Sequence, residues 1–405
     1  MGLRGLGRLE AAEACYRRAL ALQPYHAGCL SNLGNVLRER GRLDEAAQAI
    51  DLARRLAPHD PSFQYNAGLV ARDAGNPSLA RALFEAVLER QPDHGDCRWD
   101  HALALLAEGD VKRGFPAYES RWLLKRSPPP QLPLPRWAGE PLEGKTLLLL
   151  DEQGYGDLLM FARFLPLAKT QGAGRILLQC PAPLAALMAT LPEVDAVVPR
   201  GAPLPEGCDL YAPLLSLPGL LGLGPEALPG PVPYLPKPEA AALPGHAPLK
   251  LGLVWAGKPT PRDRSFPLEA LLPHLDDPRW RLYSLQTGPR AQDLAASGAN
   301  AFVHDLGPAL TDFAATARLL AGLDALVTCD TAIAHLAGAL ALPTFVPLLH
   351  YSDWRWGDHG ERTPWYPTLR LFRQPRAADW ASPLAALGQA LRAFADERNL
   401  QTQLK

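Results

Sequence analysis

The chain has 405 residues, of which 47% are hydrophobic and 20% are charged, a composition typical of a globular protein. This length is too great for one hydrophobic core and predicts two or three domains. Because 41 Lys and Arg residues balance 42 Asp and Glu residues, the net charge of -1 gives no electrostatic basis for binding nucleic acid or an anionic membrane.

The N-terminal sequence has no apolar core of the signal-peptide type, and no segment approaches about 18 consecutive apolar residues. We therefore expect a cytoplasmic protein without an integral membrane segment. The six cysteines are scattered without a CxxC pair, so we expect reduced thiols rather than disulfides or zinc ligands.

A repeat occupies the first quarter of the chain. Four glycines mark it at a constant step of 34 residues, which is the tetratricopeptide period: Gly7, Gly41, Gly75 and Gly109. Small residues recur at the same step, and they would let paired helices approach closely: Gly34, Gly68 and Ala102. We predict an all-α tetratricopeptide domain over residues 1–125. It either only extends the scaffold or presents a surface for a peptide or protein, and we favour the second interpretation.

A proline cluster follows the repeats, from Pro128 to Pro135. Proline cannot continue a helix, so the cluster predicts a linker over residues 126–143 or a strand laid along the next domain.

Beyond the linker, short apolar runs alternate with longer helical patterns, as in parallel sheets whose strands are joined by crossover helices. The expected strands are 146–151, 175–180, 194–199, 251–257, 280–286, 301–307, 325–330 and 343–349. A proline-rich segment near residue 240 divides them into two series. We predict two Rossmann-like domains, over residues 144–240 and 241–405, and a closing helix over residues 383–398 that braces both sheets.

Glycines and polar residues collect where these strands end, in "DEQGYGD", "WAGK", "SLQTG" and "CDTA". Open parallel sheets bind ligands at the carboxyl ends of their strands. Glycine lets a backbone approach a ligand closely, and a following helix N-terminus attracts phosphate. None of these turns fits GxGxxG or GxxxxGK[ST], so neither a dinucleotide site nor a P-loop is predicted.

Asp330 and Thr331 lie where an expected strand ends and a helix begins, so either side chain is a candidate cap for the first amides of that helix. His335 follows Thr331 by four residues and shares its helix face. Spacing alone favours a buried structural histidine over a ligand-binding one, without deciding between them.

Several segments resemble, in order, bacterial tetratricopeptide-linked glycosyltransferases, which are related to heptosyltransferases and distantly to O-GlcNAc transferase. They include "LLLLDEQGYGDLLMFARFLPL", "LGLVWAGKPTPRDRSFPL" and "VTCDTAIAHLAGALALPTFVPLLHYSDWRWGDHGERTPWYPTLRLFRQ". The resemblance covers most of residues 115–375. It implies a GT-B fold, in which two Rossmann-like domains face each other across a cleft and the second holds most of the nucleotide-sugar.

The resemblance also implies roles for individual residues. The heptosyltransferase pattern D-T-G-x-x-H, near the donor diphosphate, is matched by Asp330, Thr331, Ala332 and His335. A glycine turn ending in the candidate base is matched by Gly154, Gly156 and Asp157.

Further residues complete the expected site. Arg264 in "RSFP" matches a lysine that precedes "WP" in heptosyltransferases. Lys258 and Gln286 follow strands and are further candidates for donor binding, although a solvated loop charge and turn chemistry explain them equally well. Asp157 has a plain alternative as a helix cap, and Glu152 is a competing base.

A base positioned for the acceptor hydroxyl contributes about 100 to 10,000-fold to the rate of glycosyl transfer. Helix amides and cations can stabilise the departing nucleoside diphosphate, so we expect neither a metal nor a cofactor. The leading hypothesis is an inverting glycosyltransferase that moves a sugar from a nucleotide-sugar to a protein held by the repeats. One alternative acceptor is a lipid-linked or free glycan, and another alternative is a non-catalytic repeat adaptor with a degenerate cleft.

Overall fold

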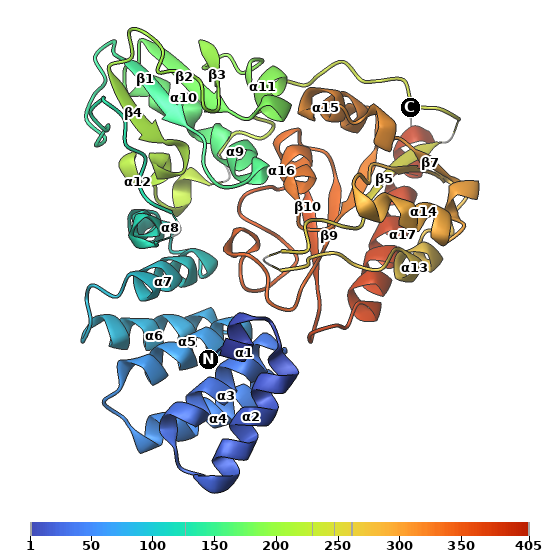
Figure 1. Cartoon of the computed structure of the whole chain (residues 1–405). Coiled ribbons are helices and arrows are strands. Elements are labelled where there is room, and N and C mark those ends of the chain that lie inside the picture. The colour runs from blue at the N-terminus through green and yellow to red at the C-terminus, as the bar shows by residue number, and fades with distance from the viewer. Residues whose placement is uncertain (1, 126, 229, 247, 261, 404–405) are drawn as a thin grey trace. The chain divides into compact units, whose positions relative to one another are not determined.

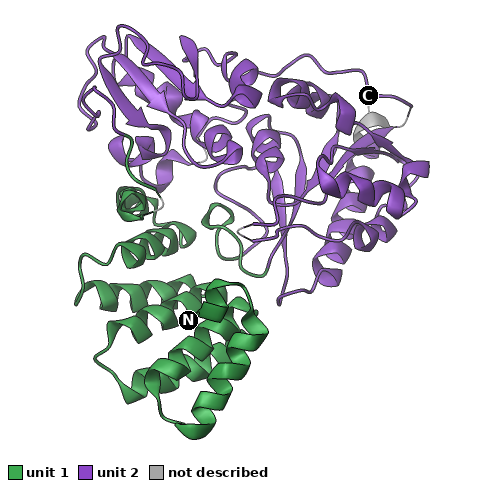
Figure 2. Cartoon of the chain, viewed as in Figure 1, with its two compact units in different colours: residues 1–130, 350–359 green, residues 131–349, 360–405 purple. Residues whose placement is uncertain are grey.

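The computed structural model describes residues 2–125, 127–228, 230–246, 248–260 and 262–403. Residue 1 of the predicted first domain, residue 126 of the predicted linker and residues 404–405 of the predicted last domain lie outside the described residues. The chain divides into two compact units: residues 1–130 with 350–359, and residues 131–349 with 360–405 (Figure 2). Within the described ranges, no helix has both the length and the apolar character needed to span a membrane.

The first unit consists of paired helices (Figure 1). The pairs are α1 (Gly2–Gly5) with α2 (Leu9–Leu22), α3 (Ala27–Glu39) with α4 (Leu43–Leu56), α5 (Pro61–Asp73) with α6 (Pro77–Leu88), and α7 (Gly95–Ala107) with α8 (Val111–Tyr118). After the first helix of each pair comes a repeat glycine with φ between 72° and 81°, where a side chain would be strained: Gly7, Gly41, Gly75 and Gly109. The constant step of 34 residues therefore reflects one glycine with a positive φ after the first helix of each repeat.

The second set of small repeat residues lies where paired helices touch. A Cβ atom added to Gly34 would be 2.4 Å from the side chain of Ile50, and one added to Gly68 would be 2.4 Å from that of Phe84. Ala102 is completely buried. The predicted close approach of the paired helices is confirmed.

A loop from the far end of the sequence, residues 350–359, belongs to this helical unit. Its Trp354 is buried, and the indole ring packs edge-on against Phe115 and Tyr118, with centroid separations of 6.2 and 6.0 Å. The Arg72 guanidinium lies 5.7 Å from the ring centroid of Tyr351. The repeats and this loop therefore share one core.

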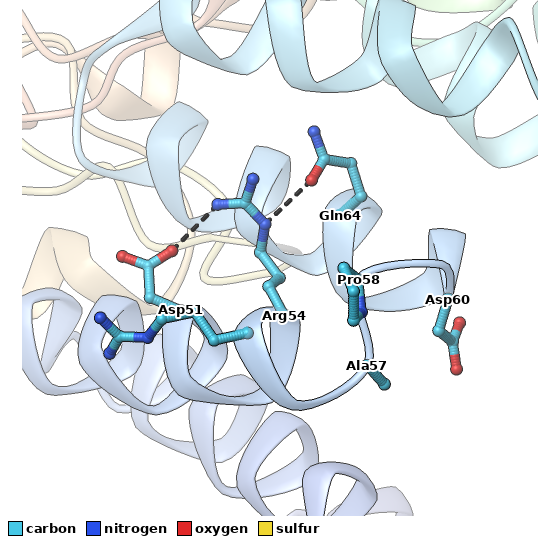
Figure 3. A pocket seen from close by; sticks show the side chains of 7 residues that line it. Asp51, Arg54, Ala57, Pro58, Asp60 and Gln64 are labelled. Atoms are coloured by element: carbon cyan, nitrogen blue, oxygen red, sulfur yellow. Dashed lines mark hydrogen bonds and ion pairs between the residues drawn. The ribbon is translucent and has the colours of Figure 1, made fainter.

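A pocket of about 370 Å³ opens at the turn between α4 and α5 (Figure 3). Arg54 crosses it and donates to Asp51 Oδ1 at 3.0 Å and to Gln64 Oε1 at 2.9 Å. Three of the lining side chains thus bond to one another.

The second unit contains two sheets whose paired strands are all parallel. The first has the order β3-β2-β1-β4, with β1 (Thr146–Leu150), β2 (Arg175–Cys180), β3 (Ala196–Pro199) and β4 (Leu210–Pro213). The second has the order β10-β9-β8-β5-β6-β7, with β5 (Leu249–Val254), β6 (Trp280–Ser284), β7 (Val303–Asp305), β8 (Ala325–Thr328), β9 (Thr344–Leu348) and β10 (Leu369–Arg373). The predicted class, helical repeats followed by α/β domains with parallel sheets, is confirmed.

The segment predicted as a linker or strand runs beside β4. Tyr211 of β4 donates its N–H to Pro135 O at 3.1 Å and accepts from Trp137 N at 2.8 Å. Described residues of the proline-rich segment therefore lie along the edge of the first sheet, while the domain boundaries themselves stay predictions.

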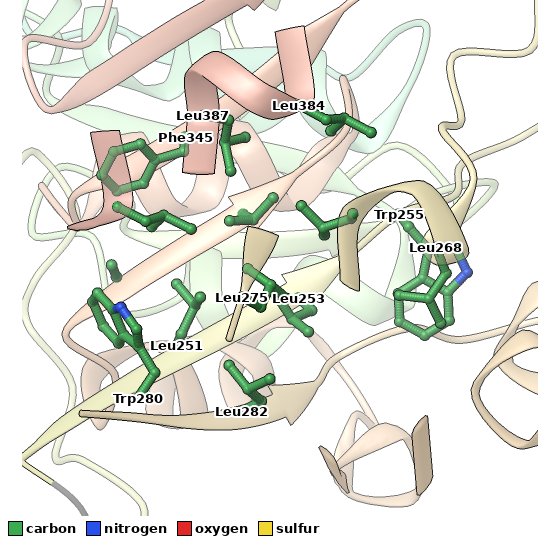
Figure 4. Close-up of a cluster of buried hydrophobic side chains, with 14 of the residues drawn as sticks. Leu251, Leu253, Trp255, Leu268, Leu275, Trp280, Leu282, Phe345, Leu384 and Leu387 are labelled. Carbon is green, nitrogen blue, oxygen red and sulfur yellow. The ribbon is translucent and has the colours of Figure 1, made fainter. Parts of the chain in front are cut away.

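Helices connect and cover these strands. They are α9 (Tyr155–Phe161), α10 (Leu165–Thr170), α11 (Ala182–Met188), α12 (Leu217–Leu220), α13 (Leu268–Leu271), α14 (Asp293–Ala296), α15 (Phe313–Ala321), α16 (Ala332–Ala339) and α17 (Ala381–Gln403). The buried leucines of α17, among them Leu384 and Leu387, pack into the core of the second sheet with Leu251 and Phe345 (Figure 4). We predicted that this helix braces both sheets, but its buried side chains belong to the second.

The strand order reverses beside the first strand of each series. β1 lies between β2 and β4, and β5 lies between β6 and β8. The second sheet thus has the doubly wound order of mononucleotide-binding halves, and such sheets bind ligands outside the strand ends at the reversal. The loops that follow β1, β4, β5 and β8 are therefore where a site is expected on topology alone.

Candidate active site

Arg264 and Asp330 come together at the reversal point of the second sheet. Arg264 lies in the segment after β5, and Asp330 lies between β8 and α16. Arg264 Nη1 is 3.2 Å from Asp330 Oδ2, and the Asp330 side chain is only 7% exposed. A buried carboxylate thus anchors a partly exposed guanidinium beside the start of α16.

The first turn of α16 has no side-chain cap from its N-cap residue, Thr331. The Thr331 hydroxyl is instead 3.3 Å from the hydroxyl of Thr328. Thr331 and Ala332 are both partly exposed. The first amides of a helix attract anions, and the expected diphosphate contacts at Thr331 and Ala332 stay predictions.

Asp157 lies in the first turn of α9, after β1. Its Oδ2 atom accepts a hydrogen bond from the N–H of Gly154 at 2.8 Å. This is the capping role considered from the sequence, and it fixes the carboxylate at the reversal point of the first sheet. The competing base Glu152 also lies there, because its Oε1 accepts from Leu215 N, after β4, at 3.3 Å.

The starts of α9 and α16 approach each other closely. A Cβ atom added to Gly156 would lie 2.7 Å from Cδ2 of His335, 3.4 Å from its Nε2 and 3.5 Å from Cα of Ala332. Only glycine fits this contact without displacing a neighbour. The structure therefore brings together the two motifs that the sequence singled out separately, the glycine turn and the D-T-x-x-x-H segment.

Gln286 does not fit its predicted role in donor binding. Its Oε1 accepts from the backbone N–H groups of Trp255 and Ala256 at 3.1 and 2.9 Å. Its Nε2 donates to the carbonyls of Ala256 and Thr287 at 3.1 and 2.9 Å. A primary amide has two donors and two acceptor positions, so Gln286 is fully used in joining the ends of β5 and β6. We leave it out of the proposed site.

Lys258 follows β5 and is exposed. No short contact ties it to the predicted donor residues among the described side chains, so its role in donor binding stays a prediction.

A largely buried polar cluster that was not predicted from the sequence lies behind His335, formed by Arg163, Tyr234 and Tyr366. His335 Nδ1 is 2.9 Å from the hydroxyl oxygen of Tyr366, which lies 3.4 Å from that of Tyr234. Arg163 lies after α9 and packs over both phenol rings, 4.7 Å from each centroid. The cluster thus links α9, the connector between the sheets, α16 and the segment before β10.

Arg163 is held in this cluster by carbonyl and hydroxyl oxygens. Its Nε donates to Met160 O at 3.0 Å and its Nη1 to Trp365 O at 2.8 Å. Burial alone would lower the pKa of Arg163, but Tyr234 and Tyr366 raise it, so the guanidinium stays charged. The sequence did carry a signal, because a single arginine interrupts the apolar pattern "LLMFARFLPL".

A family model described as tetratricopeptide repeat matches residues 2–61 and 65–130, which confirms the predicted repeat. Protein FlbA of Caulobacter vibrioides is 31% identical over 430 residues, covering 97% of this chain and 72% of FlbA. The chain belongs to the FlbA family. Because the match covers 97% of this chain, it includes both the repeats and the α/β domains of the chain.

Two solved structures also resemble this FlbA-family chain. The heptosyltransferase II of E. coli, described as an ADP-heptose lipopolysaccharide enzyme, is 16% identical and matches 63% of this chain and 99% of its own, with a TM-score of 0.44. O-GlcNAc transferase from Thermobaculum terrenum is 16% identical and matches 98% and 90%, with a TM-score of 0.35. With TM-scores under 0.5, neither likeness bears on the chemistry of this chain.

Proposed function

We propose that this protein is a glycosyltransferase that moves a sugar, with inversion and without a metal, from a nucleotide-sugar donor to a protein acceptor held by the repeats. One observation carries the proposal. The first turns of α9 and α16 meet at Gly156 and His335, and the reversal points of both sheets supply the surrounding side chains.

The donor diphosphate is assigned to the start of α16. Backbone N–H groups at Thr331 and Ala332 carry the positive end of the helix dipole, and Arg264 adds a guanidinium. Asp330 anchors Arg264 at 3.2 Å. These groups favour departure of the nucleoside diphosphate, because negative charge grows on its oxygen as the bond to the sugar breaks. Lys258 is a further candidate cation in the same loop region.

The base is assigned to Asp157. Its carboxylate takes the proton of the acceptor hydroxyl while that oxygen attacks the anomeric carbon from the side opposite the diphosphate. The carbon–phosphate-oxygen bond breaks, and its electron pair leaves with the nucleoside diphosphate. The hydrogen bond from Gly154 to Oδ2 supports this role, because it holds the carboxylate in one orientation.

The protein acceptor is assigned to the tetratricopeptide unit. Stacked repeats present extended surfaces of the kind that bind peptides. The tetratricopeptide family model, matched over residues 2–61 and 65–130, supports this half of the proposal.

Donor binding is tested by calorimetry and thermal unfolding of the full chain with UDP-, GDP-, ADP-, CMP- and dTDP-sugars. A donor at about 100 times its Kd should stabilise the protein by about 2.7 kcal/mol. We expect one nucleotide class to bind the parent and to bind Arg264→Ala weakly. Arg376→Ala, at a guanidinium that is 85% exposed, is the control and should bind as the parent does.

Transfer is tested by incubating the full chain with cell extract and a nucleotide-sugar of the class that binds, radiolabelled in its sugar. Label that becomes soluble after protease digestion supports a protein acceptor. Label that follows organic solvent or deproteinised glycan would instead support a lipid-linked or free glycan acceptor. Asp157→Asn should abolish incorporation in either fraction while leaving donor binding in place.

A second candidate function, a non-catalytic adaptor, is favoured by the capping bond of Asp157. That bond accounts for the carboxylate without any chemistry. The adaptor interpretation predicts that no donor binds the folded parent, and that Asp157→Ala cells keep normal glycosylation.

A further inference from the structure

The imidazole ring of His335 is confined on two edges. On one edge, Nδ1 lies 2.9 Å from the Tyr366 hydroxyl oxygen. On the opposite edge, Cδ2 and Nε2 face Gly156, where a Cβ atom would be 2.7 Å and 3.4 Å away from them. His335 itself is only 5% exposed. The ring therefore has one orientation, with Nε2 directed at the first turn of α9.

The Tyr366 ring is seated by a glycine on the same helix as His335. A Cβ atom added to Gly338 would lie 2.3 Å from Cδ1 of Tyr366. Glycine in a helix interior costs about 0.5–1 kcal/mol relative to alanine. The close contact explains why α16 carries glycine here, one turn after His335, and it leaves Tyr366 completely buried.

The direction of the hydrogen bond between Tyr366 and His335 follows from the neighbours. The Tyr234 hydroxyl donates to Leu159 O at 2.9 Å, so its hydrogen is engaged there. Arg163 bonds the Tyr366 hydroxyl as well, and a guanidinium can only donate. Burial raises the pKa of the Tyr366 hydroxyl well above its usual value, so that hydroxyl keeps its hydrogen. The Tyr366 hydrogen then has two acceptors within reach, the Tyr234 hydroxyl oxygen at 3.4 Å and His335 Nδ1 at 2.9 Å, and the shorter contact favours His335.

A neutral imidazole that accepts at Nδ1 carries its hydrogen on Nε2. We propose that Tyr366 is a positioning residue that fixes His335 as the Nε2–H tautomer, so that the ring donates a hydrogen bond toward the glycine turn. The assignment to donor binding rests on the proposed function, since the group that receives this hydrogen bond is then the diphosphate or the sugar. Arg163 and Tyr234 act one step further back, by holding the Tyr366 hydroxyl in place.

The tautomer is measured by long-range proton–nitrogen NMR on the full chain labelled with ¹⁵N-histidine. His335→Gln identifies the His335 signals by their loss. We expect the parent to show the Nε2–H pattern and Tyr366→Phe to show a mixture or the Nδ1–H pattern. An Nδ1–H pattern in the parent would overturn the proposal, as would an unchanged pattern in a folded Tyr366→Phe. The parent spectrum is decisive alone if that variant fails to fold.

Tyr283→Phe is a matched control. Tyr283 is also fully buried, its hydroxyl donates to Pro244 O at 2.7 Å, and its ring stacks on His304 with centroids 5.6 Å apart. Removing this hydroxyl deletes a comparable hydrogen bond beside another histidine of the same unit. The His335 pattern should stay that of the parent.

Donor binding gives a second readout. Glutamine places an amide nitrogen near the position of Nε2, whereas asparagine places one near Nδ1. We expect His335→Gln to keep donor affinity within about tenfold of the parent, and His335→Asn to lose about tenfold more. The reverse order would overturn the assigned donor atom. If no donor binds the parent at all, the proposed function fails, while the NMR result still tests the positioning role.

Discussion

Arg264 carries the most direct prediction at the scale of single residues. Its guanidinium is held at 3.2 Å by a buried carboxylate, so little rotamer freedom is lost when an anion binds. Arg264→Ala should weaken nucleoside diphosphate binding by about 1.5–3 kcal/mol, the usual range for hydrogen bonds to charged groups. Arg264→Lys should recover only part of this loss, because lysine lacks the planar fork. Equal affinities by calorimetry for all three proteins would remove Arg264 from the donor site.

Gly156 tests the contact between the two helix starts. In Gly156→Ala the new methyl group meets the His335 ring at 2.7 Å, and that ring is confined on its other side. We expect a loss of about 1–3 kcal/mol in unfolding free energy, as for other overpacked sites, together with displaced His335 resonances. Gly5→Ala in α1 is the control, because a Cβ atom there meets nothing within 4 Å. A Gly156→Ala protein as stable as the parent would show that the helices can separate at no cost.

Among the secondary-structure elements, a ladder of ion pairs joins the first helices of the repeats. Arg38 of α3 donates to Asp73 of α5 at 2.5 Å, and Arg72 of α5 donates to Asp100 of α7 at 2.7 Å. Burial alone would raise the pKa of Asp73, but the charges of Arg72 and Arg38 outweigh it and hold that pKa below 3.8. Because its pKa is lowered in the folded protein, ionised Asp73 stabilises the fold at pH values above 3.8. This contribution is lost as the pH falls through the pKa that Asp73 has in the folded state.

Asp73→Asn should therefore lower the thermal midpoint near neutral pH, with a cost of roughly 1–3 kcal/mol. The gap between parent and variant should shrink as the pH is lowered below 3.8. Asp51→Asn is the control, since the Asp51 side chain is 56% exposed and should contribute little at any pH. A gap that stays constant or widens in acid would contradict the assigned role of the ladder.

The elements that could be predicted were those with local signals. A glycine needed at a left-handed helix end, or a run of apolar residues in a buried strand, is visible within a few residues of sequence. β4 and β10 were missed for the opposite reason. β4 is the four-residue segment "LYAP" among prolines and glycines, and β10 is the five-residue segment "LRLFR", in which two arginines break up a short apolar run.

In the candidate site, too, the residues that could be predicted were those with local sequence signals. Asp157, Asp330 and His335 belong to short motifs at strand ends, so their neighbourhood followed from topology. Tyr366 lies 31 residues after His335 and reaches it only through tertiary packing, which no local pattern encodes. Arg163 follows the glycine turn closely in sequence, but its contacts with Tyr366 and Tyr234 also arise from tertiary packing. Gln286 was predicted to bind the donor because it is a polar residue after a strand. Such a side chain can bond either to a ligand or to the adjacent strand end, and here it bonds to the strand end.

At the scale of the whole molecule, the loop 350–359 governs how the chain can be dissected. Trp354 is buried against Phe115 and Tyr118, and both partners lie in the repeats. Trp354→Ala should lower the unfolding free energy of the full chain by about 3–5 kcal/mol, as for other large core residues. Leu123→Ala, at a side chain that is 52% exposed, should cost much less. Equal denaturant midpoints for the two variants would mean that the indole adds nothing to this core.

The same loop limits how such proteins can be recombined. A tetratricopeptide array is often treated as a cassette that can be fused to a new enzyme with one crossover. Here the helical core draws aromatic side chains from a segment that lies between β9 and β10, so a single crossover would separate those rings from the surface they cover. A productive chimaera would need two matched exchanges, one at the repeats and one at the loop. We therefore expect changes in the repeats and in this loop to be inherited together.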